Sequence, residues 1–166
     1  MSPSGAVIMG VFAAVWWWVG ITASANGSTL MYTVPLVMTG AVIATASLRR
    51  TGGARPSVAE DARRGRLVGY ASGAEGIAIF VAVNVLANIR KLDFLAPTVA
   101  VIVGLHFVPL ARWLPARSYY VTSALLVALG SVGFTIADAN QRLLIVSIGA
   151  ACVLWLTCAA VLREAR

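Results

Sequence analysis

The chain has 166 residues, of which 60% are hydrophobic and 11% are charged, and its net charge is +7. Soluble domains carry about 25% charged residues, so this composition excludes an ordinary soluble fold and predicts a surface that faces lipid. A β-barrel is also excluded, because its segments alternate between polar and apolar residues, whereas the apolar runs here are continuous.

The apolar runs are long enough to be membrane helices, since such a helix needs about 20 residues. We predict an all-α polytopic membrane protein of six transmembrane helices in a single domain over residues 1–166. The lipid bilayer is its expected partner, in a cell membrane of the bacterial inner-membrane type. The predicted spans are about 5–25, 30–48, 66–89, 94–111, 119–137 and 143–162, with a basic cytoplasmic loop at 49–65.

The first run contains three consecutive tryptophans, Trp16, Trp17 and Trp18. Residues 23–25 resemble a signal-peptidase site, but no Lys or Arg precedes the run, so we expect an uncleaved first span. Three consecutive residues cover about 200° of a helix. Their expected role is anchoring at the membrane interface and packing. A more specific alternative is an aromatic wall for an apolar or cationic ligand.

The segment before the third run has a capping-box pattern, in which Glu60 follows Ser57 by three positions. This pattern predicts a helix from about Ser57 that continues into the third span. Basic residues gather in cytoplasmic loops. Placing both termini in the cytoplasm leaves Arg90, Lys91 and Arg142 as the only basic residues outside. The net charge therefore indicates topology rather than a nucleic-acid site.

The three predicted outer turns share the pattern Ala-Asn-x-x-x-Leu, with its asparagine at Asn26, Asn88 and Asn140. Each pattern lies at the same point of a predicted helical hairpin. Parallel repeats are a known plan for membrane proteins. The pattern therefore predicts three tandem hairpins, with the asparagines ending or capping helices.

The third run carries more polar groups than any other, namely Glu75, Asn84 and Asn88. The two asparagines lie about 180° and about 220° around the helix from the acid. This run is therefore polar on two opposite faces, and we expect it to be the most buried helix. Gly69 and Gly73 form a G-x-x-x-G step, which favours close helix approach.

His106 is the second titratable group predicted to lie well inside a span. Glu75 and His106 lie about 13 Å and about 9 Å from the cytoplasmic ends of neighbouring antiparallel helices. Contact between them would favour a carboxylate–imidazolium pair. Pro109 lacks the N–H that would otherwise bond the Leu105 carbonyl, so an acceptor is free nearby.

A transmembrane carboxylate indicates function by default, because an unpaired charge at the bilayer centre is costly. Our leading hypothesis is a small-solute, ion or proton-coupled transporter or channel that uses Glu75 and His106, with Asn84 and Asn88 along the path. An alternative is a ligand- or lipid-binding or structural membrane module without transport, and a homo-oligomer is compatible with either.

A membrane-embedded enzyme is the least favoured hypothesis, because the sequence has no nucleophile motif, metal set or cofactor motif. Lys91, in a turn, is the only lysine, which excludes a retinal Schiff base within a span. Cys152 and Cys158 lie about 9 Å apart along one helix and point in different directions, so they cannot form a disulfide with each other. We expect them to be small packing residues.

Overall fold

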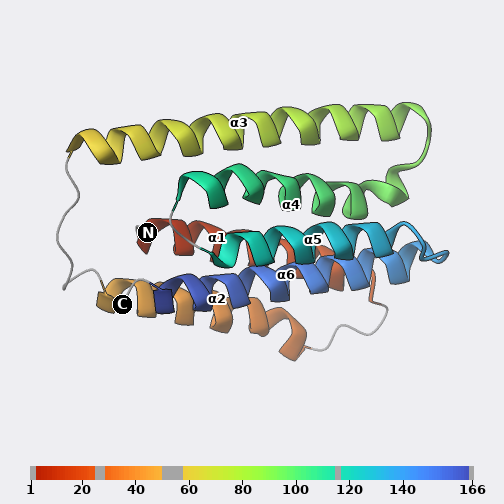
Figure 1. Cartoon of the computed structure of the whole chain (residues 1–166). Coiled ribbons are helices and arrows are strands. Elements are labelled where there is room, and N and C mark those ends of the chain that lie inside the picture. Colours follow the sequence, from red (N-terminus) through yellow and green to blue (C-terminus); the bar gives the residue numbers. More distant parts are fainter. Residues whose placement is uncertain (1–2, 25–28, 50–57, 115–116, 165–166) are drawn as a thin grey trace.

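The computed structural model describes residues 3–24, 29–49, 58–114 and 117–164. Within these ranges the chain forms six α-helices and one short 3-10 helix (Figure 1). The prediction of an all-α protein is therefore confirmed. The helices are α1 Pro3–Ile21, α2 Thr29–Arg49, α3 Val58–Asn88, η1 Leu92–Phe94, α4 Leu95–Trp113, α5 Ser118–Gly133 and α6 Ala139–Glu164.

Four of the described helical segments are long and apolar enough to cross a membrane by length and composition. They are Thr29–Leu48, Gly65–Asn88, Leu92–Trp113 and Ala139–Glu164. The other two apolar segments, Gly5–Ile21 and Ser118–Gly133, are shorter. The structure therefore supports membrane-type helices, at a coarser level than the six spans predicted.

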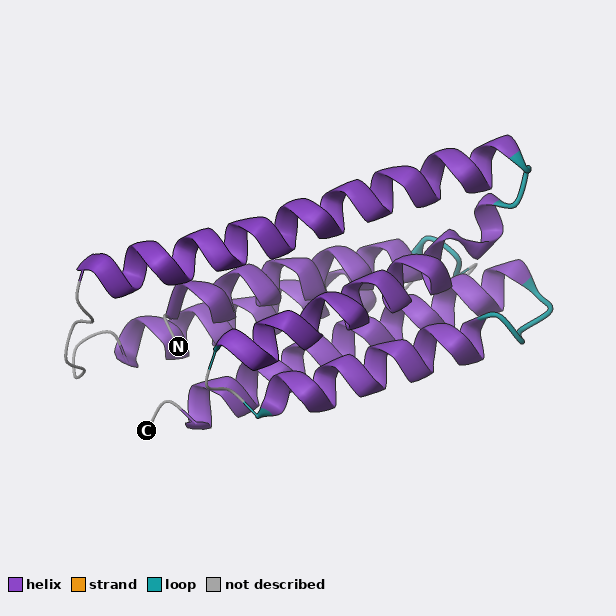
Figure 2. Ribbon diagram, turned by 45° about the horizontal axis from the view of Figure 1, so that its top comes forward, coloured by secondary structure: helices purple, strands orange, loops and turns teal. Residues whose placement is uncertain are grey.

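The helices lie roughly side by side in one bundle (Figure 2). The most extensive interfaces join α4 to α5 and α1 to α6, and α6 also contacts α2, α4 and α5. Each sequential pair that three hairpins would require is in contact. The threefold repeat nevertheless stays a prediction, and Asn26 in its first copy lies outside the described residues.

Glycines allow the close approach of α4 and α5. A Cβ atom added at Gly130 would lie 2.6 Å from Val101 Cγ2 and 2.7 Å from the Pro97 carbonyl oxygen. A Cβ atom at Gly104 would lie 2.8 Å from Val127 Cγ2. These distances are too short for real atoms, so the interface needs small residues, as helix contacts in membranes commonly do.

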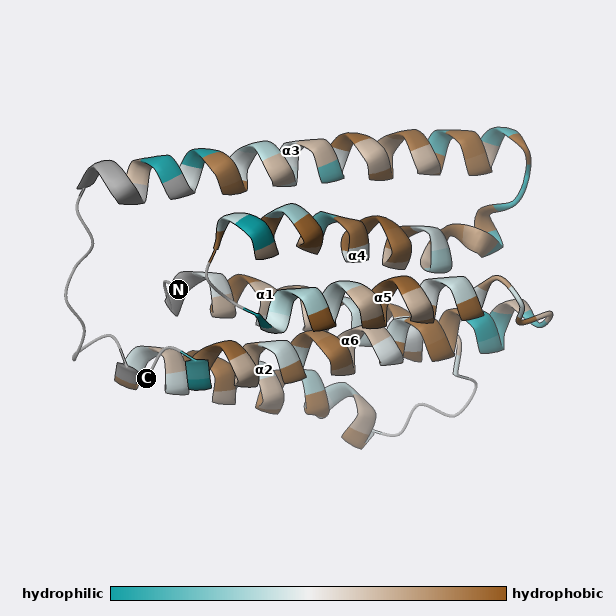
Figure 3. Ribbon diagram, in the orientation of Figure 1, coloured by the Kyte–Doolittle hydropathy of each residue, from teal (hydrophilic) through white to brown (hydrophobic). Residues whose placement is uncertain are grey.

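The helices are apolar along much of their length, and most of the strongly polar residues lie near their ends (Figure 3). Large side chains such as Phe12, Leu36, Ile77, Phe80 and Leu156 are exposed. The most buried part of α6, by contrast, is built largely from small side chains, including Ala150, Ala151 and Cys158. An apolar exterior of this extent suits a lipid environment better than water.

The expectation that the third span is the most buried helix is wrong. Within the described chain, α3 contacts α4 and η1 only, and it lies at the edge of the bundle (Figure 1). Ala71 is its only buried residue among those whose side chains are described. A Cβ atom at Gly69 or Gly73 would meet nothing within 4 Å.

Local hydrogen bonding explains why α3 can be polar on two faces without being central. The Asn84 amide donates to the carbonyl of Phe80 one turn earlier in the same helix, at 2.7 Å. The carboxylate of Glu75 faces His106 on α4. Only one of the two faces therefore needs a neighbouring helix to satisfy its polar group.

Arg142 joins two turns at the end of the bundle. It is only 3% exposed, and its guanidinium donates to the carbonyls of Ile136 at 2.6 Å and Asp93 at 3.2 Å. The same group forms an ion pair with the Asp93 carboxylate at 3.4 Å and lies 3.9 Å above the Phe94 ring. Arg142 therefore links the α5–α6 connection to η1.

Candidate functional site

The turn after α3 sets the alignment of the two helices that form the site. Arg90 adopts a left-handed conformation with φ 56°, and the N–H of Lys91 donates to the Leu86 carbonyl at 2.8 Å. This is the bond pattern that commonly ends a helix. The chain then reverses through η1 into α4, so α3 and α4 lie antiparallel in contact.

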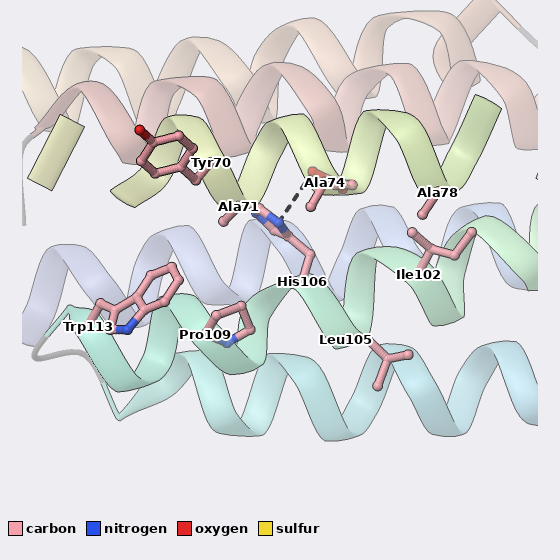
Figure 4. A pocket seen from close by; sticks show the side chains of 10 residues that line it. Tyr70, Ala71, Ala74, Ala78, Ile102, Leu105, His106, Pro109 and Trp113 are labelled. Carbon is pink, nitrogen blue, oxygen red and sulfur yellow. Dashed lines mark ion pairs between the residues drawn. The ribbon is translucent and has the colours of Figure 1, made fainter. Parts of the chain in front are cut away.

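A cavity of about 390 Å³ lies between α3 and α4 (Figure 4). The residues that line it follow helical spacing on one face of each helix. From α3 these are Tyr70, Ala71, Ala74, Glu75 and Ala78. From α4 these are Ile102, Leu105, His106, Pro109 and Trp113.

The titratable pair of this cavity is Glu75 with His106. Oε2 of Glu75 lies 3.6 Å from Nδ1 of His106. Their side chains are 20% and 10% exposed, respectively, so both are largely shielded. The structure thus brings together the two titratable groups that the sequence predicted at similar depth. Their attraction is that of an ion pair when the imidazole is protonated.

An aromatic chain connects His106 to the protein core. The His106 ring meets the ring of Phe107 edge to face, with centroids 5.8 Å apart, and Phe107 in turn contacts Tyr119 of α5 at 5.4 Å. Pro109 lies inside α4 and has no N–H to donate to the Leu105 carbonyl. The cavity therefore has an imidazole that is packed beside Phe107 and a carbonyl acceptor, that of Leu105, one turn from Pro109.

Alanines create the space, and two aromatic residues flank one end of it. Ala71, Ala74 and Ala78 bring only methyl groups to the α3 wall. Tyr70 from α3 and Trp113 from α4 lie at the same end of the cavity (Figure 4). Sequence reasoning missed both aromatics, although Tyr70 precedes Glu75 by about one and a half turns and Trp113 follows His106 by about two.

The two asparagines predicted to line a path lie away from the cavity. Asn84 is exposed and bonds within its own helix. Asn88 is exposed and is the last residue of α3. The structure brings neither of them to Glu75 and His106.

The three tryptophans of α1 have separate surroundings. Trp17 donates from Nε1 to the Met31 carbonyl at 2.8 Å, and its ring lies 5.6 Å from that of Trp155. Trp16 packs against the core, whereas Trp18 is 41% exposed. Of the three, only Trp17 lines the second cavity, of about 300 Å³, together with Ile21, Met31, Leu144, Ile145 and Ile148.

Neither cysteine is in a disulfide. Cys158 is buried and donates to the Ala6 carbonyl at 3.4 Å, and Cys152 is exposed. The part of the chain that the structure describes has no group of three or more His, Cys, Asp or Glu residues that could hold a metal ion.

Long apolar helices with an apolar exterior define an all-helical protein of membrane type. The chain belongs to the family of unknown function DUF7010, whose family model matches residues 2–164. No match was found among curated proteins or among solved structures. The chemistry of the site must therefore be argued from its own geometry.

Proposed function

We propose that all six described helices cross a membrane, with both termini in the cytoplasm. The first turn of α1 and the last turn of α6 lie at the same end of the bundle, which supports this topology (Figure 1). The end of α2, the start of α3 and the end of α4 lie there too, close in sequence to most of the basic residues.

Cysteine labelling in intact cells tests this topology. In a background with Cys152 and Cys158 replaced by alanine, an impermeant maleimide should label Lys91→Cys. It should label Thr51→Cys only after the membrane is permeabilised. The reverse pattern would overturn the proposed orientation, and labelling of both sites in intact cells would overturn the number of spans.

We propose that the protein is a proton-coupled transporter or channel for a small cation, with Glu75 and His106 as its ion-binding pair. One observation carries the proposal: Glu75 and His106, whose Oε2 and Nδ1 atoms are 3.6 Å apart, line a cavity between two apolar helices. A charge in this setting is costly unless it is paired or wet, so such residues are usually kept for function.

The pair allows the positive charge that neutralises Glu75 to be exchanged for another. While His106 is protonated, its imidazolium neutralises Glu75 in place. When the imidazole loses its proton, the carboxylate is the remaining charge of the cavity lining. It then accepts a proton or another cation. If Glu75 is neutralised in turn by a proton and by another cation, the movement of that cation is coupled to the movement of a proton.

Flux measurements in proteoliposomes test this function. Wild-type protein should dissipate an imposed pH gradient, detected with an entrapped pH-sensitive dye. Glu75→Gln should reduce this proton flux by at least about tenfold, because the uncharged amide cannot exchange a proton. Asn84→Ala, on the same helix but outside the cavity, serves as the control. Undiminished flux in Glu75→Gln would overturn the proposal.

The second cavity favours an alternative, a lipid-binding module without transport. Trp17, Ile21 and Met31 line it together with aliphatic residues of α6. An acyl chain fits such a lining through the hydrophobic effect. Retention of a lipid in native mass spectrometry, lost on Ile148→Trp, together with an absence of proton flux, would favour this function.

A further inference from the structure

We infer that the α3–α4 cavity binds an organic monocation with an apolar body, such as a quaternary ammonium ion. The inference rests on the proposed function for the same site and adds the chemical class of its ligand. Four features of the lining carry it: its charge, its aromatic end, its shortage of oxygen ligands and its apolar remainder.

The charge of the lining fits one positive charge. Of the ten lining residues, Glu75 is the only acid and His106 the only base. With the imidazole neutral, the cavity holds one carboxylate, 20% exposed. A monocation neutralises it, whereas a divalent cation would leave a buried excess charge, which is strongly unfavourable.

The aromatic end fits a weakly hydrated cation. Tyr70 and Trp113 come from opposite helices and flank the same end of the cavity (Figure 4). Ring faces attract cations, and the recognition of quaternary ammonium groups by such rings is well established. An alkylammonium group placed between this end and Glu75 would meet a carboxylate on one side and aromatic rings on another.

The lining offers too few oxygen atoms for a bare metal ion. Calcium takes six to eight oxygen ligands in proteins, and magnesium keeps a complete octahedron. Glu75 is the only carboxylate here, and Pro109 leaves one carbonyl, that of Leu105, without its helical N–H donor. An organic cation needs no such shell, because its alkyl groups cover its charge.

The rest of the lining is apolar and of suitable size. Ile102, Leu105 and the α3 alanines form the wall beyond the pair. The twelve residues from Ile102 to Trp113 span about 16 Å of helix. A volume of about 390 Å³ lies in the usual range for a small-molecule site, roughly 300–1,000 Å³. The ligand should therefore place its apolar part towards Ile102 and its charge towards Trp113.

Equilibrium dialysis of the full-length protein in detergent tests the inference, with benzyltrimethylammonium as the probe. Its uncharged carbon isostere, neopentylbenzene, and sodium ions serve as competitors. We expect saturable binding of the probe that neither competitor displaces. Glu75→Gln should weaken binding by at least about tenfold, and Trp113→Ala by about two- to fivefold, since an exposed cation–π contact is modest.

A second variant keeps the test decisive if Glu75→Gln fails to fold. Ala74→Leu fills the cavity without removing a charge, and it should also weaken binding by about tenfold. Ala87→Leu, the same substitution on α3 at a position that does not line the cavity, is its matched control and should bind normally. Equal binding by wild type, Ala74→Leu and Ala87→Leu would overturn the site.

The result also separates this inference from the proposed function. Proton flux that depends on Glu75, without saturable binding of the probe, would overturn the organic-cation site but would still support the proposed transport function. Probe binding that depends on Glu75, without flux of protons or probe, would support the site and overturn transport. If neopentylbenzene displaced the probe as effectively as unlabelled benzyltrimethylammonium does, the inference that the site recognises the positive charge would be overturned.

Discussion

Oε2 of Glu75 on α3 lies 3.6 Å from Nδ1 of His106 on α4, at a cavity whose other lining residues on α3 are Tyr70 and alanines. Because the two groups come from different helices, their attraction contributes both to a site and to the docking of α3. The contribution to docking can be measured separately by a double-mutant cycle.

His106→Ala should lower the free energy of unfolding more than Glu75→Gln/His106→Ala does. The single variant leaves a carboxylate without its partner, whereas the double variant removes both charges. Breaking a fully buried pair costs about 3–5 kcal/mol, and we expect about 1–3 kcal/mol here because Glu75 is partly exposed. Thermal unfolding in detergent, followed by circular dichroism, measures both. A double variant less stable than His106→Ala would contradict the pairing.

Gly130→Ala should destabilise the protein by about 1–3 kcal/mol, as overpacking does. The added methyl group would lie 2.6 Å from Val101 Cγ2 and 2.7 Å from a backbone oxygen, so α4 and α5 would have to separate. Gly69→Ala is the matched control, since its methyl group would meet nothing within 4 Å. Thermal unfolding should show a lower melting temperature for the first variant and an unchanged or higher one for the second.

Arg142→Lys should destabilise the protein by about 1–3 kcal/mol even though the charge is kept. A lysine ammonium cannot reproduce the planar group that bonds the Ile136 carbonyl, meets Asp93 and covers the Phe94 ring. Arg163→Lys, at an exposed position near the end of α6, should have no measurable effect. Equal melting temperatures for the two variants would show that Arg142 acts only as a charge.

Cys152 should react with a membrane-permeant maleimide in detergent, and Cys158 should not. The thiol of Cys152 is exposed on α6, whereas the thiol of Cys158 is buried and donates a hydrogen bond to the Ala6 carbonyl. Mass spectrometry of labelled peptides should therefore find one modified cysteine in folded protein and two after denaturation. Modification of Cys158 in folded protein would contradict its placement against α1.

Helix register made the pairing of Glu75 with His106 predictable. A short turn forces α3 and α4 to lie antiparallel. The number of residues between each group and the end of its helix therefore gives the level of that group along the bundle axis. The helix that begins at Val58 was also predictable, because the Ser57 and Glu60 pattern depends on neighbours in sequence only. Ser57 and the side chain of Glu60 themselves lie outside the described residues. The homo-oligomer and the repeat stay predictions.

The position of α3 could not be deduced from its polarity. The argument assumed that each polar face needs a neighbouring helix, but Asn84 bonds a carbonyl of its own helix. The role of Arg142 was missed for a different reason. Its partners Asp93 and Phe94 lie in a distant part of the chain and meet it only when the bundle forms. The cavity likewise depends on cross-helix alignment of Tyr70 with Trp113.

Because α3 lies at the edge of the bundle, one wall of the candidate site is held by a single helix–helix interface. Within the described chain, α3 touches only α4 and η1, so a tilt of α3 repacks one helix–helix surface and leaves the other five helices in register. Opening or closing around a ligand would therefore cost the energy of a single interface. The Glu75–His106 contact crosses that interface, and a change in its charge would act directly on the angle between the two helices.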